Sequence, residues 1–240
     1  MNSLPLRRIR SFVRRDSRMT DAQKRAVDMF LPTFGLNLKD GLINLATVFQ
    51  RTAKTNLEIG FGSGYSLLEM AKSYPHENFI GIETHLPGIG SLLAGIESLE
   101  LKNIRVFYAD AVEVLQHCIP DESLDVVQIF FPDPWPKRKH HKRRLIQDNF
   151  VKLILNKLKW NGTIHLATDW QHYAEHMMVV LSNIPDLKNA MGAGHYADRS
   201  SQRPVVTKFE QRGQECGRDI WELQFIRVGA TGTAIKLSKS

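Results

Sequence analysis

The sequence predicts an α/β protein built on one mostly parallel sheet with helices on both faces. From about residue 55, short β-rich runs alternate with amphipathic stretches, a pattern typical of parallel strands joined by crossover helices. The 240 residues are enough for one good-sized core and favour one domain over two. Hydrophobic content of 42% and charged content of 24% are ordinary globular values, which excludes wholesale disorder and a coiled coil.

The elements are expected in the following order. Thr20 and Gln23 have the spacing of a capping box, which predicts a helix over about 21–30. Hydrophobic periodicity predicts strands at 55–59, 78–82, 104–108, 124–131, 162–168 and 220–227, and helices at about 64–73, 88–100, 111–118, 143–158 and 171–183. Weak periodicity with Gly, Ser and Pro predicts a loop-rich stretch over 186–206. We therefore divide the chain into an Arg-rich arm at 1–20, one domain at 21–228 and a flexible tail at 229–240.

The net charge of +7 is concentrated in two short segments. Residues 1–18 hold six arginines and one acid, and residues 137–144 hold six Lys or Arg, two His and no acid. The rest of the chain has 20 basic and 24 acidic residues, a charge of −4. Clustered Lys and Arg release counterions from phosphates, so this distribution favours a nucleic-acid partner, although two solvated charged surfaces remain the alternative.

Other compositional signals concern location. No run approaches the eighteen or so apolar residues of a spanning helix, which predicts that the protein has no membrane partner. The Arg-rich start lacks the apolar core of a secretory signal, and a mitochondrial transit peptide is disfavoured because Ile9, Phe12 and Val13 interleave with the arginines. The two cysteines cannot form a disulfide scaffold or a four-cysteine zinc site, which indicates a reducing compartment, and we expect a cytoplasmic protein.

A glycine-rich turn follows the first of the expected alternating strands. Gly60, Gly62 and Gly64 permit a tight turn and a close approach of the backbone to a ligand, although a purely structural turn is an alternative. Tyr65 stands where a dinucleotide fingerprint has its third glycine, and the acid Glu58 precedes the turn. This form favours S-adenosylmethionine over NAD, because the amino-acid moiety of that cofactor replaces a pyrophosphate.

Acids also end the next two strands. Glu83 is placed to accept hydrogen bonds from both hydroxyls of a ribose, with a helix cap or an exposed carboxylate as the alternative. Asp110, followed by Ala111, is placed to cap the next helix, to accept a hydrogen bond from an adenine amino group, or to do both. Three acids after three successive strands, with the glycine turn at the first, indicate the cofactor site of a class I methyltransferase.

The fourth strand of this set leads into a rigid segment with an acid and an indole. Pro132, Pro134 and Pro136 fix an extended backbone around Asp133 and Trp135, which are expected at the carboxyl edge of the sheet. The basic run from 137 to 144 follows without interruption. The simplest substrate is therefore a nucleic-acid base, with Lys and Arg on the phosphates.

These segments resemble the bacterial tRNA (guanine-N7)-methyltransferase family (TrmB). The resemblance is carried by residues 132–144 (PDPWPKRKHHKRR) with the upstream arm at 9–15, and by further matches at 57–64, 87–90, 167–170 and 207–213. It covers roughly residues 7–228 in order. Within 214–218 this chain has Gln-Glu-Cys-Gly-Arg where the family tends to carry Arg-Leu-Gly-His.

The resemblance implies a single Rossmann-like class I methyltransferase domain with a mostly parallel, seven-stranded sheet. S-adenosyl-L-methionine would be the cofactor, and the reaction would methylate N7 of a guanosine in the tRNA variable loop, conventionally numbered 46. Asp133 would be the catalytic residue. The cofactor would contact Glu58, Gly60, Gly62, Gly64, Glu83, Asp110, Ala111 and Asp133. The substrate would contact Lys137, Asp169, Thr207, Lys208, Phe209 and Glu210, and the RNA would lie on Lys139, His140, His141, Lys142, Arg143 and Arg144.

Two other clusters are interpreted as structural. His172 and His176 are spaced i, i+4 after Asp169, but without a further ligand we expect ordinary helix histidines and no metal. Cys118 precedes Ile119-Pro120 rather than following a proline, so we expect a small buried hydrophobic residue and not a nucleophile.

Three other functions remain open on the residues. Asp133-Pro-Trp is distantly similar to the Asp-Pro-Pro-aromatic motif of N6-adenine methyltransferases. An NAD-dependent oxidoreductase is disfavoured by the glycine spacing, and a non-catalytic RNA-binding protein is disfavoured by the intact set of acids. The expected partner is tRNA, with no obligate protein partner, in a monomer or a homodimer.

Overall fold

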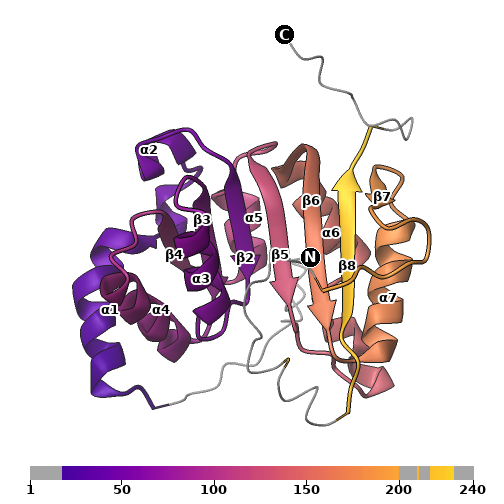
Figure 1. The fold of residues 1–240 in the computed structure, drawn as a ribbon, viewed down its shortest axis with the longest axis horizontal. Helices are drawn as coiled ribbons and strands as arrows, with labels where there is room; N and C mark the ends of the chain where they lie inside the picture. The colour runs from indigo at the N-terminus through magenta and orange to yellow at the C-terminus, as the bar shows by residue number, and fades with distance from the viewer. Residues whose placement is uncertain (1–17, 200–209, 211–216, 230–240) are drawn as a thin grey trace, which may run out of the picture.

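An eight-stranded sheet runs through the molecule with helices on both of its faces (Figure 1). The computed structural model describes residues 18–199, 210 and 217–229. The strand order is β1-β4-β3-β2-β5-β6-β8-β7. The first six of these strands are parallel to their neighbours, whereas β8 is antiparallel to both β6 and β7. The predicted mostly parallel α/β fold is therefore confirmed.

The elements have the following bounds. The strands are β1 (Gly35–Leu36), β2 (Thr55–Ile59), β3 (Asn78–Glu83), β4 (Ile104–Tyr108), β5 (Leu124–Phe130), β6 (Leu158–Thr168), β7 (Leu187–Asn189) and β8 (Trp221–Arg227). The α-helices are α1 (Asp21–Phe34), α2 (Leu45–Phe49), α3 (Tyr65–Ser73), α4 (Leu86–Ser98), α5 (Ala111–His117), α6 (Asp148–Lys157) and α7 (Gln171–Ser182). Two 3₁₀ helices complete the set, η1 (Leu38–Asp40) and η2 (Arg138–Arg143).

Two hydrophobic layers hold the helices against the sheet. One joins α1, α3 and α4 to alternate residues of β3 and β4, with Phe79, Ile104 and Val106 at its base. The other joins α5, α6 and α7 to β2, β5, β6 and β8 through residues such as Ile129 and Leu166. Side chains alternate across a strand, so a run such as β2 is buried on both faces. This burial fixes the strand register, and with it the positions of the residues that follow each strand.

The capping box predicted at the start of α1 is present. Gln23 N donates to Thr20 Oγ1 at 3.2 Å, and Thr20 N donates to Gln23 Oε1 at 2.9 Å. The helix continues to Phe34, four residues beyond the expected end, because it packs along α4. The close approach is possible at Gly90, where a Cβ would come within 2.8 Å of Gln23 Cβ.

Several short elements were not predicted, and two boundaries were placed wrongly. The elements β1, α2 and β7 have no periodic signal of their own, and β7 lies in the stretch expected to be loop-rich. With β1 and β7, the six strands predicted from periodicity become eight, one more than the seven that the resemblance implied. The helix predicted over 143–158 begins only at Asp148, because the basic residues before it form η2 and Arg144 is extended. Strand β6 begins at Leu158, four residues earlier than expected, and its pairing with β5 has a register shift there.

Several expectations fall on residues that the structure does not describe. These are the arm at 1–17, the segments 200–209 and 211–216, and the tail at 230–240.

Cys118 is fully buried, as predicted, and burial raises the pKa of its thiol. None of the helices in the described ranges combines the length and the apolar character that crossing a membrane requires.

Candidate active site

A cavity of about 790 Å³ opens at the carboxyl edge of the sheet, the edge marked in Figure 1 by the arrowheads of β2 and β5. The strands β2, β3, β4 and β5 are parallel, so the residues that follow them meet at this edge. The cavity is within the size range of small-molecule and cofactor sites. It brings together seven of the eight residues predicted to contact the cofactor: Glu58, Gly60, Gly62, Glu83, Asp110, Ala111 and Asp133.

The glycine turn forms one wall of the cavity. Gly60 and Gly62 have φ of +77° and +61°, in the left-handed region that favours glycine. Gly88, at the start of α4, lies against this turn, and a Cβ at Gly88 would come within 2.1 Å of Gly62 O. Gly64 caps α3 and packs beside Leu92, so it does not line the cavity. The turn therefore exposes backbone to the cavity where a side chain would fill the space.

Glu83 ties the glycine turn to the end of β3. Its Oε2 accepts a hydrogen bond from Gly62 N at 2.9 Å, and its Oε1 accepts from Thr84 N at 2.6 Å and His85 N at 3.0 Å. A carboxylate has about four acceptor positions, and these three bonds leave one of the two on Oε2. The residue thus orders the loop and still has an acceptor position at the cavity wall.

Asp110 and Glu58 complete the acidic wall. Asp110 is the N-cap of α5, and its Oδ1 accepts from Val112 N at 2.9 Å, which confirms the capping role that the sequence left open. Glu58 is 3% exposed and lines the cavity from the end of β2, two residues before Gly60. The cavity is mostly apolar beyond these acids, with Ile82, Ile129 and Phe130 among its walls.

This set of donors and walls fits S-adenosylmethionine. The acids suit the hydroxyl and amino groups of the cofactor, the apolar walls suit its adenine, and the glycine turn admits its amino-acid end close to the backbone. Among the described residues that line the cavity there are four acids and no Lys or Arg, so these residues offer the turn no cluster of cations suited to a pyrophosphate.

The segment from Phe130 to Pro136 forms the mouth of the cavity. Phe131 N donates to Ala167 O at 2.8 Å, which anchors the segment to β6. Phe131 and Trp135 have φ of +51° and +45°, an uncommon conformation for bulky residues. Strained backbone of this kind persists only where surrounding contacts fix it. Asp133 lines the cavity and is exposed at its mouth.

The basic segment, residues 137–144, leads away from this mouth as η2. Lys137, Lys139 and Lys142 are exposed. The aromatic ring of Trp135 lies between two members of the segment, with the Arg143 guanidinium 4.9 Å from the ring centre and the His140 ring at 5.7 Å. Loss of hydration and the neighbouring Arg and Lys charges lower the pKa of His140.

Arg144 differs from the other members of the basic segment because it is only 4% exposed. Its Nε donates to Pro134 O at 2.9 Å, and its guanidinium lies 4.9 Å from the centre of the Tyr173 ring. Arg144 is therefore a buried residue in a basic run whose lysines are exposed, a difference that the sequence does not show.

The predicted substrate residues are only partly described. Asp169 follows β6, and its Oδ2 accepts from Arg218 Nη1 at 2.7 Å. Glu210 is 1% exposed and pairs with Arg199 at 2.9 Å. Thr207, Lys208 and Phe209 lie outside the described residues.

Some residues that line the cavity were not predicted from the sequence. Gln23 of α1 reaches the cavity and donates from Nε2 to Ser91 Oγ on α4 at 2.9 Å. Its position in a capping box was the only signal it carried, and that signal concerns the helix rather than a ligand. His85 and Pro87 follow Glu83 and line the wall beside it, and only the resemblance at 87–90 pointed to that loop.

Comparisons with known proteins agree with this geometry. A family model described as a putative methyltransferase matches residues 52–223. Solved structures with a similar fold include an antibiotic-related methyltransferase (TM-score 0.53, 17% identity, 79% of this chain and 94% of that one) and the 16S rRNA methyltransferase KamB (TM-score 0.54, 12% identity, 93% and 100%).

The curated relatives are far more similar. A tRNA (guanine-N(7)-)-methyltransferase of Idiomarina loihiensis is 53% identical over 92% of this chain and 89% of the relative. The proteins of the same name from Salmonella choleraesuis and Ectopseudomonas mendocina are each 51% identical, over 95% of both chains and 92% of both chains respectively. The cavity, the acids at three strand ends and these identities lead to one conclusion: the chain belongs to the tRNA (guanine-N7)-methyltransferase family of class I S-adenosylmethionine-dependent methyltransferases.

Proposed function

We propose that the chain transfers the methyl group of S-adenosylmethionine to N7 of guanosine 46 in the variable loop of tRNA. The observation that carries the proposal is the position of Asp133 at the mouth of the cavity, directly before an exposed basic segment. A cofactor site and a phosphate-binding surface thus meet at one carboxylate. Family membership supports the same reaction.

The chemistry makes modest demands on the protein. S-adenosylmethionine supplies an electrophilic methyl group on a sulfonium. Guanine N7 has a free lone pair at neutral pH, so the acceptor needs no general base. Positive charge develops on the purine during the transfer, and catalysis is then mainly alignment and electrostatic stabilisation.

Each group of residues has a part in that alignment. Asp133 accepts hydrogen bonds from the N–H edge of the guanine and stabilises its developing charge. Lys139, Lys142 and Arg143 of the basic segment hold the phosphates. Lys137 and Asp169 contact the target nucleotide, together with residues 207–210.

An N6-adenine methyltransferase is not favoured, because every high-identity relative given above bears the guanine-N7 name. Because the substrate is tRNA, we propose that the protein acts in the cytoplasm.

The decisive experiment locates the methyl group. The protein is incubated with an unmodified tRNA transcript and methyl-labelled S-adenosylmethionine, and the nucleosides are mapped by mass spectrometry. We expect 7-methylguanosine at position 46 and no incorporation into a transcript with adenosine at that position. A methyl group on another atom, or equal labelling of the altered transcript, would overturn the proposal.

A further inference from the structure

We propose that Arg144 is a positioning residue that holds the Pro132–Pro136 segment, and therefore Asp133, in its working geometry, and that it does not contact RNA. The inference rests on the proposed role of Asp133. It separates Arg144 from the exposed cations with which it shares the basic segment.

The contacts of Arg144 point inward. Its Nε donates to Pro134 O at 2.9 Å, and its Nη2 lies 3.3 Å from His141 Nε2. The guanidinium carbon Cζ lies over the ring of Tyr173, 4.9 Å from its centre. With 4% of the residue exposed, a phosphate has almost no access to it, whereas Lys139 and Lys142 are open to solvent.

The proline segment needs such a contact. Proline has no N–H, so three of the five residues from Pro132 to Pro136 cannot donate a backbone hydrogen bond. A side chain instead donates to one of its carbonyls: Arg144 Nε bonds Pro134 O. The positive φ of Phe131 and Trp135 on either side of Asp133 adds strain that this contact helps to hold.

The other side of Arg144 is fixed by α7. Tyr173 is fully buried, and its hydroxyl accepts from Ile146 N at 3.2 Å. His176, one turn later, donates from Nε2 to Ile146 O at 2.8 Å. Burial raises the pKa of Tyr173, which keeps its hydroxyl neutral. Arg144 therefore connects the catalytic segment to a helix that is packed into the main core.

These contacts require an arginine in particular. A lysine keeps the positive charge but lacks both the Nε donor and the guanidinium group that lies over Tyr173. Arg144→Lys therefore separates positioning from charge. A residue that merely neutralises phosphate would tolerate this change.

The first test compares Arg144→Lys with Lys142→Ala. For Arg144→Lys we expect kcat at saturating tRNA and cofactor to fall roughly 10- to 100-fold, the scale of a misplaced catalytic group. We expect the dependence of tRNA affinity on salt to be unchanged. Lys142→Ala should instead weaken tRNA affinity and reduce the salt slope. Lys72→Ala, at an exposed lysine of α3 that does not line the cavity, should keep the wild-type kcat and salt slope. An unchanged kcat for Arg144→Lys, or a reduced salt slope, would overturn the inference.

Turnover is normalised to the fraction of chains that bind cofactor, so partial misfolding does not imitate a loss of kcat. Arg144→Gln replaces the lysine variant if that variant does not fold, and kcat decides in the same way.

The second test is a double-mutant cycle with Asp133→Asn. If Arg144 acts through the segment that carries Asp133, Arg144→Lys should cost much less in the Asp133→Asn background than in the wild type. Equal losses in both backgrounds would indicate a general structural role and overturn the inference. A fully active Asp133→Asn variant would instead refute the role of Asp133, and Arg144 would then be judged by its kcat and salt slope.

Discussion

Asp133 is a single side chain whose position depends on contacts along the chain before and after it. Replacing it by alanine removes one preorganised polar contact to the guanine. We expect Asp133→Ala to lower turnover by about 10²–10³, the usual cost of losing one such contact in a transition state. Single-turnover kinetics on a tRNA transcript at saturating S-adenosylmethionine would measure this, with urea unfolding as the control for folding. Turnover equal to that of the wild type would remove Asp133 from the mechanism.

His176 is the residue for which the structure predicts a pH effect. Burial lowers its pKa, its hydrogen bond to Ile146 O opposes this shift, and the charge of Arg144 adds to it. In the unfolded chain the imidazole has a pKa of about 6.5. As pH falls from that value towards the lower pKa of the folded state, the unfolded chain binds more protons and the free energy of unfolding decreases.

A glutamine at 176 can still donate to Ile146 O but does not titrate in this range. We therefore expect His176→Gln to lose less stability than the wild type between about pH 7.5 and about pH 5.5. Urea unfolding at the two pH values would measure the difference. His172→Gln, on the exposed part of α7, is the matched control. Identical losses in wild type and His176→Gln would contradict the prediction.

The strand ends show how much of the site a sequence can reveal. Glu83, Asp110 and the glycine turn were predictable because each follows a strand with clear periodicity, and parallel strands end at one edge. The three N–H bonds to Glu83 were not predictable, because two of the donors belong to the following loop and one to a turn 21 residues earlier. The inward orientation of Arg144 likewise depends on Tyr173, which is 29 positions away and on another element.

At the scale of elements, the basic segment shows where periodicity fails. The helix predicted over 143–158 extended into basic residues that instead form η2. Arg144 leaves the helical conformation at φ −56° and ψ 134°, which allows its side chain to reach Pro134. The local sequence pattern was compatible with a helix that starts at residue 143, but tertiary contacts set the start at Asp148.

The exposed part of that element predicts a salt effect. Replacing both Lys139 and Lys142 by alanine removes two cations from the surface beside Asp133. We expect tRNA affinity to fall and the slope of log affinity against log salt to decrease by about one to two units, since each phosphate contact contributes somewhat less than one. Cofactor affinity should not change. Fluorescence titration over a series of salt concentrations would measure the slope.

Two exposed lysines far from the cavity provide the matched control for this double variant. Lys72 on α3 and Lys188 on β7 are both exposed. Neither residue lines the cavity, and neither belongs to the basic segment. Their double alanine variant should keep the wild-type slope. Equal decreases in both double variants would mean that RNA is attracted by net charge and not by the basic segment.

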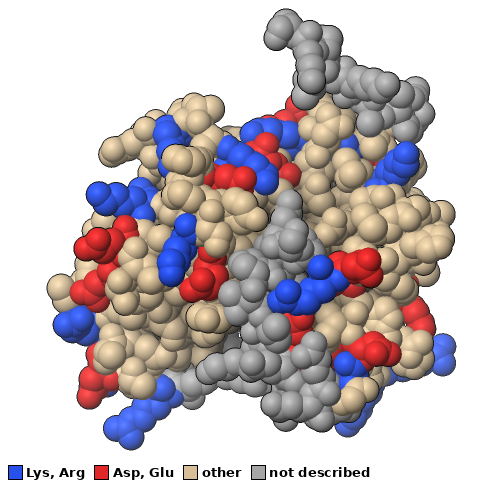
Figure 2. All heavy atoms as spheres, in the orientation of Figure 1, with Lys and Arg blue, Asp and Glu red and all other residues tan. Residues whose placement is uncertain are grey.

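At the scale of the whole molecule, the basic segment at 137–144 differs in charge from the rest of the described chain. On the face drawn in Figure 2, Lys and Arg are interspersed with Asp and Glu rather than gathered in one block. Outside residues 137–144, described Lys and Arg residues pair with acids, as in Lys54–Glu77 and Lys159–Asp125. The segment beside Asp133 has no acid within it, so it is the described part of the chain best suited to a polyanion.

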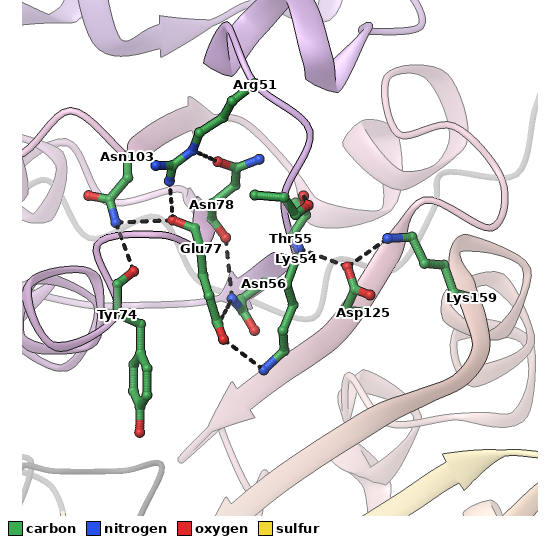
Figure 3. A network of polar contacts seen from close by, with 11 residues as sticks. Arg51, Lys54, Thr55, Asn56, Tyr74, Glu77, Asn78, Asn103, Asp125 and Lys159 are labelled. Atoms are coloured by element: carbon green, nitrogen blue, oxygen red, sulfur yellow. Dashed lines mark hydrogen bonds and ion pairs between the residues drawn. The ribbon is translucent and has the colours of Figure 1, made fainter. Parts of the chain in front are cut away.

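The opposite edge of the sheet carries a polar network that we interpret as structural (Figure 3). Arg51 donates to Asn78 Oδ1 at 2.7 Å and to Pro75 O at 2.8 Å, and Lys54 pairs with Glu77 at 3.2 Å. These residues surround the amino ends of β2 and β3, whereas the cavity lies at the carboxyl ends. We therefore interpret the amino edge of the sheet as the one that stabilises loops and the carboxyl edge as the one that binds ligands.

Asn103 tests this division of the molecule. It is 7% exposed, and its Nδ2 lies within 2.9 Å of Ala71 O, 3.1 Å of Glu77 O and 3.3 Å of Tyr74 O. Removing the amide leaves the buried carbonyl of Ala71 without this donor, which should lower the free energy of unfolding by about 1–3 kcal/mol. Urea unfolding of Asn103→Ala would measure the loss, and Asn183→Ala, at an exposed helix end, should lose much less. Because the site lies at the other edge, kcat and the KM for tRNA at a temperature where both variants are folded should equal those of the wild type. A loss of kcat in the folded Asn103→Ala variant would show that the two edges are coupled.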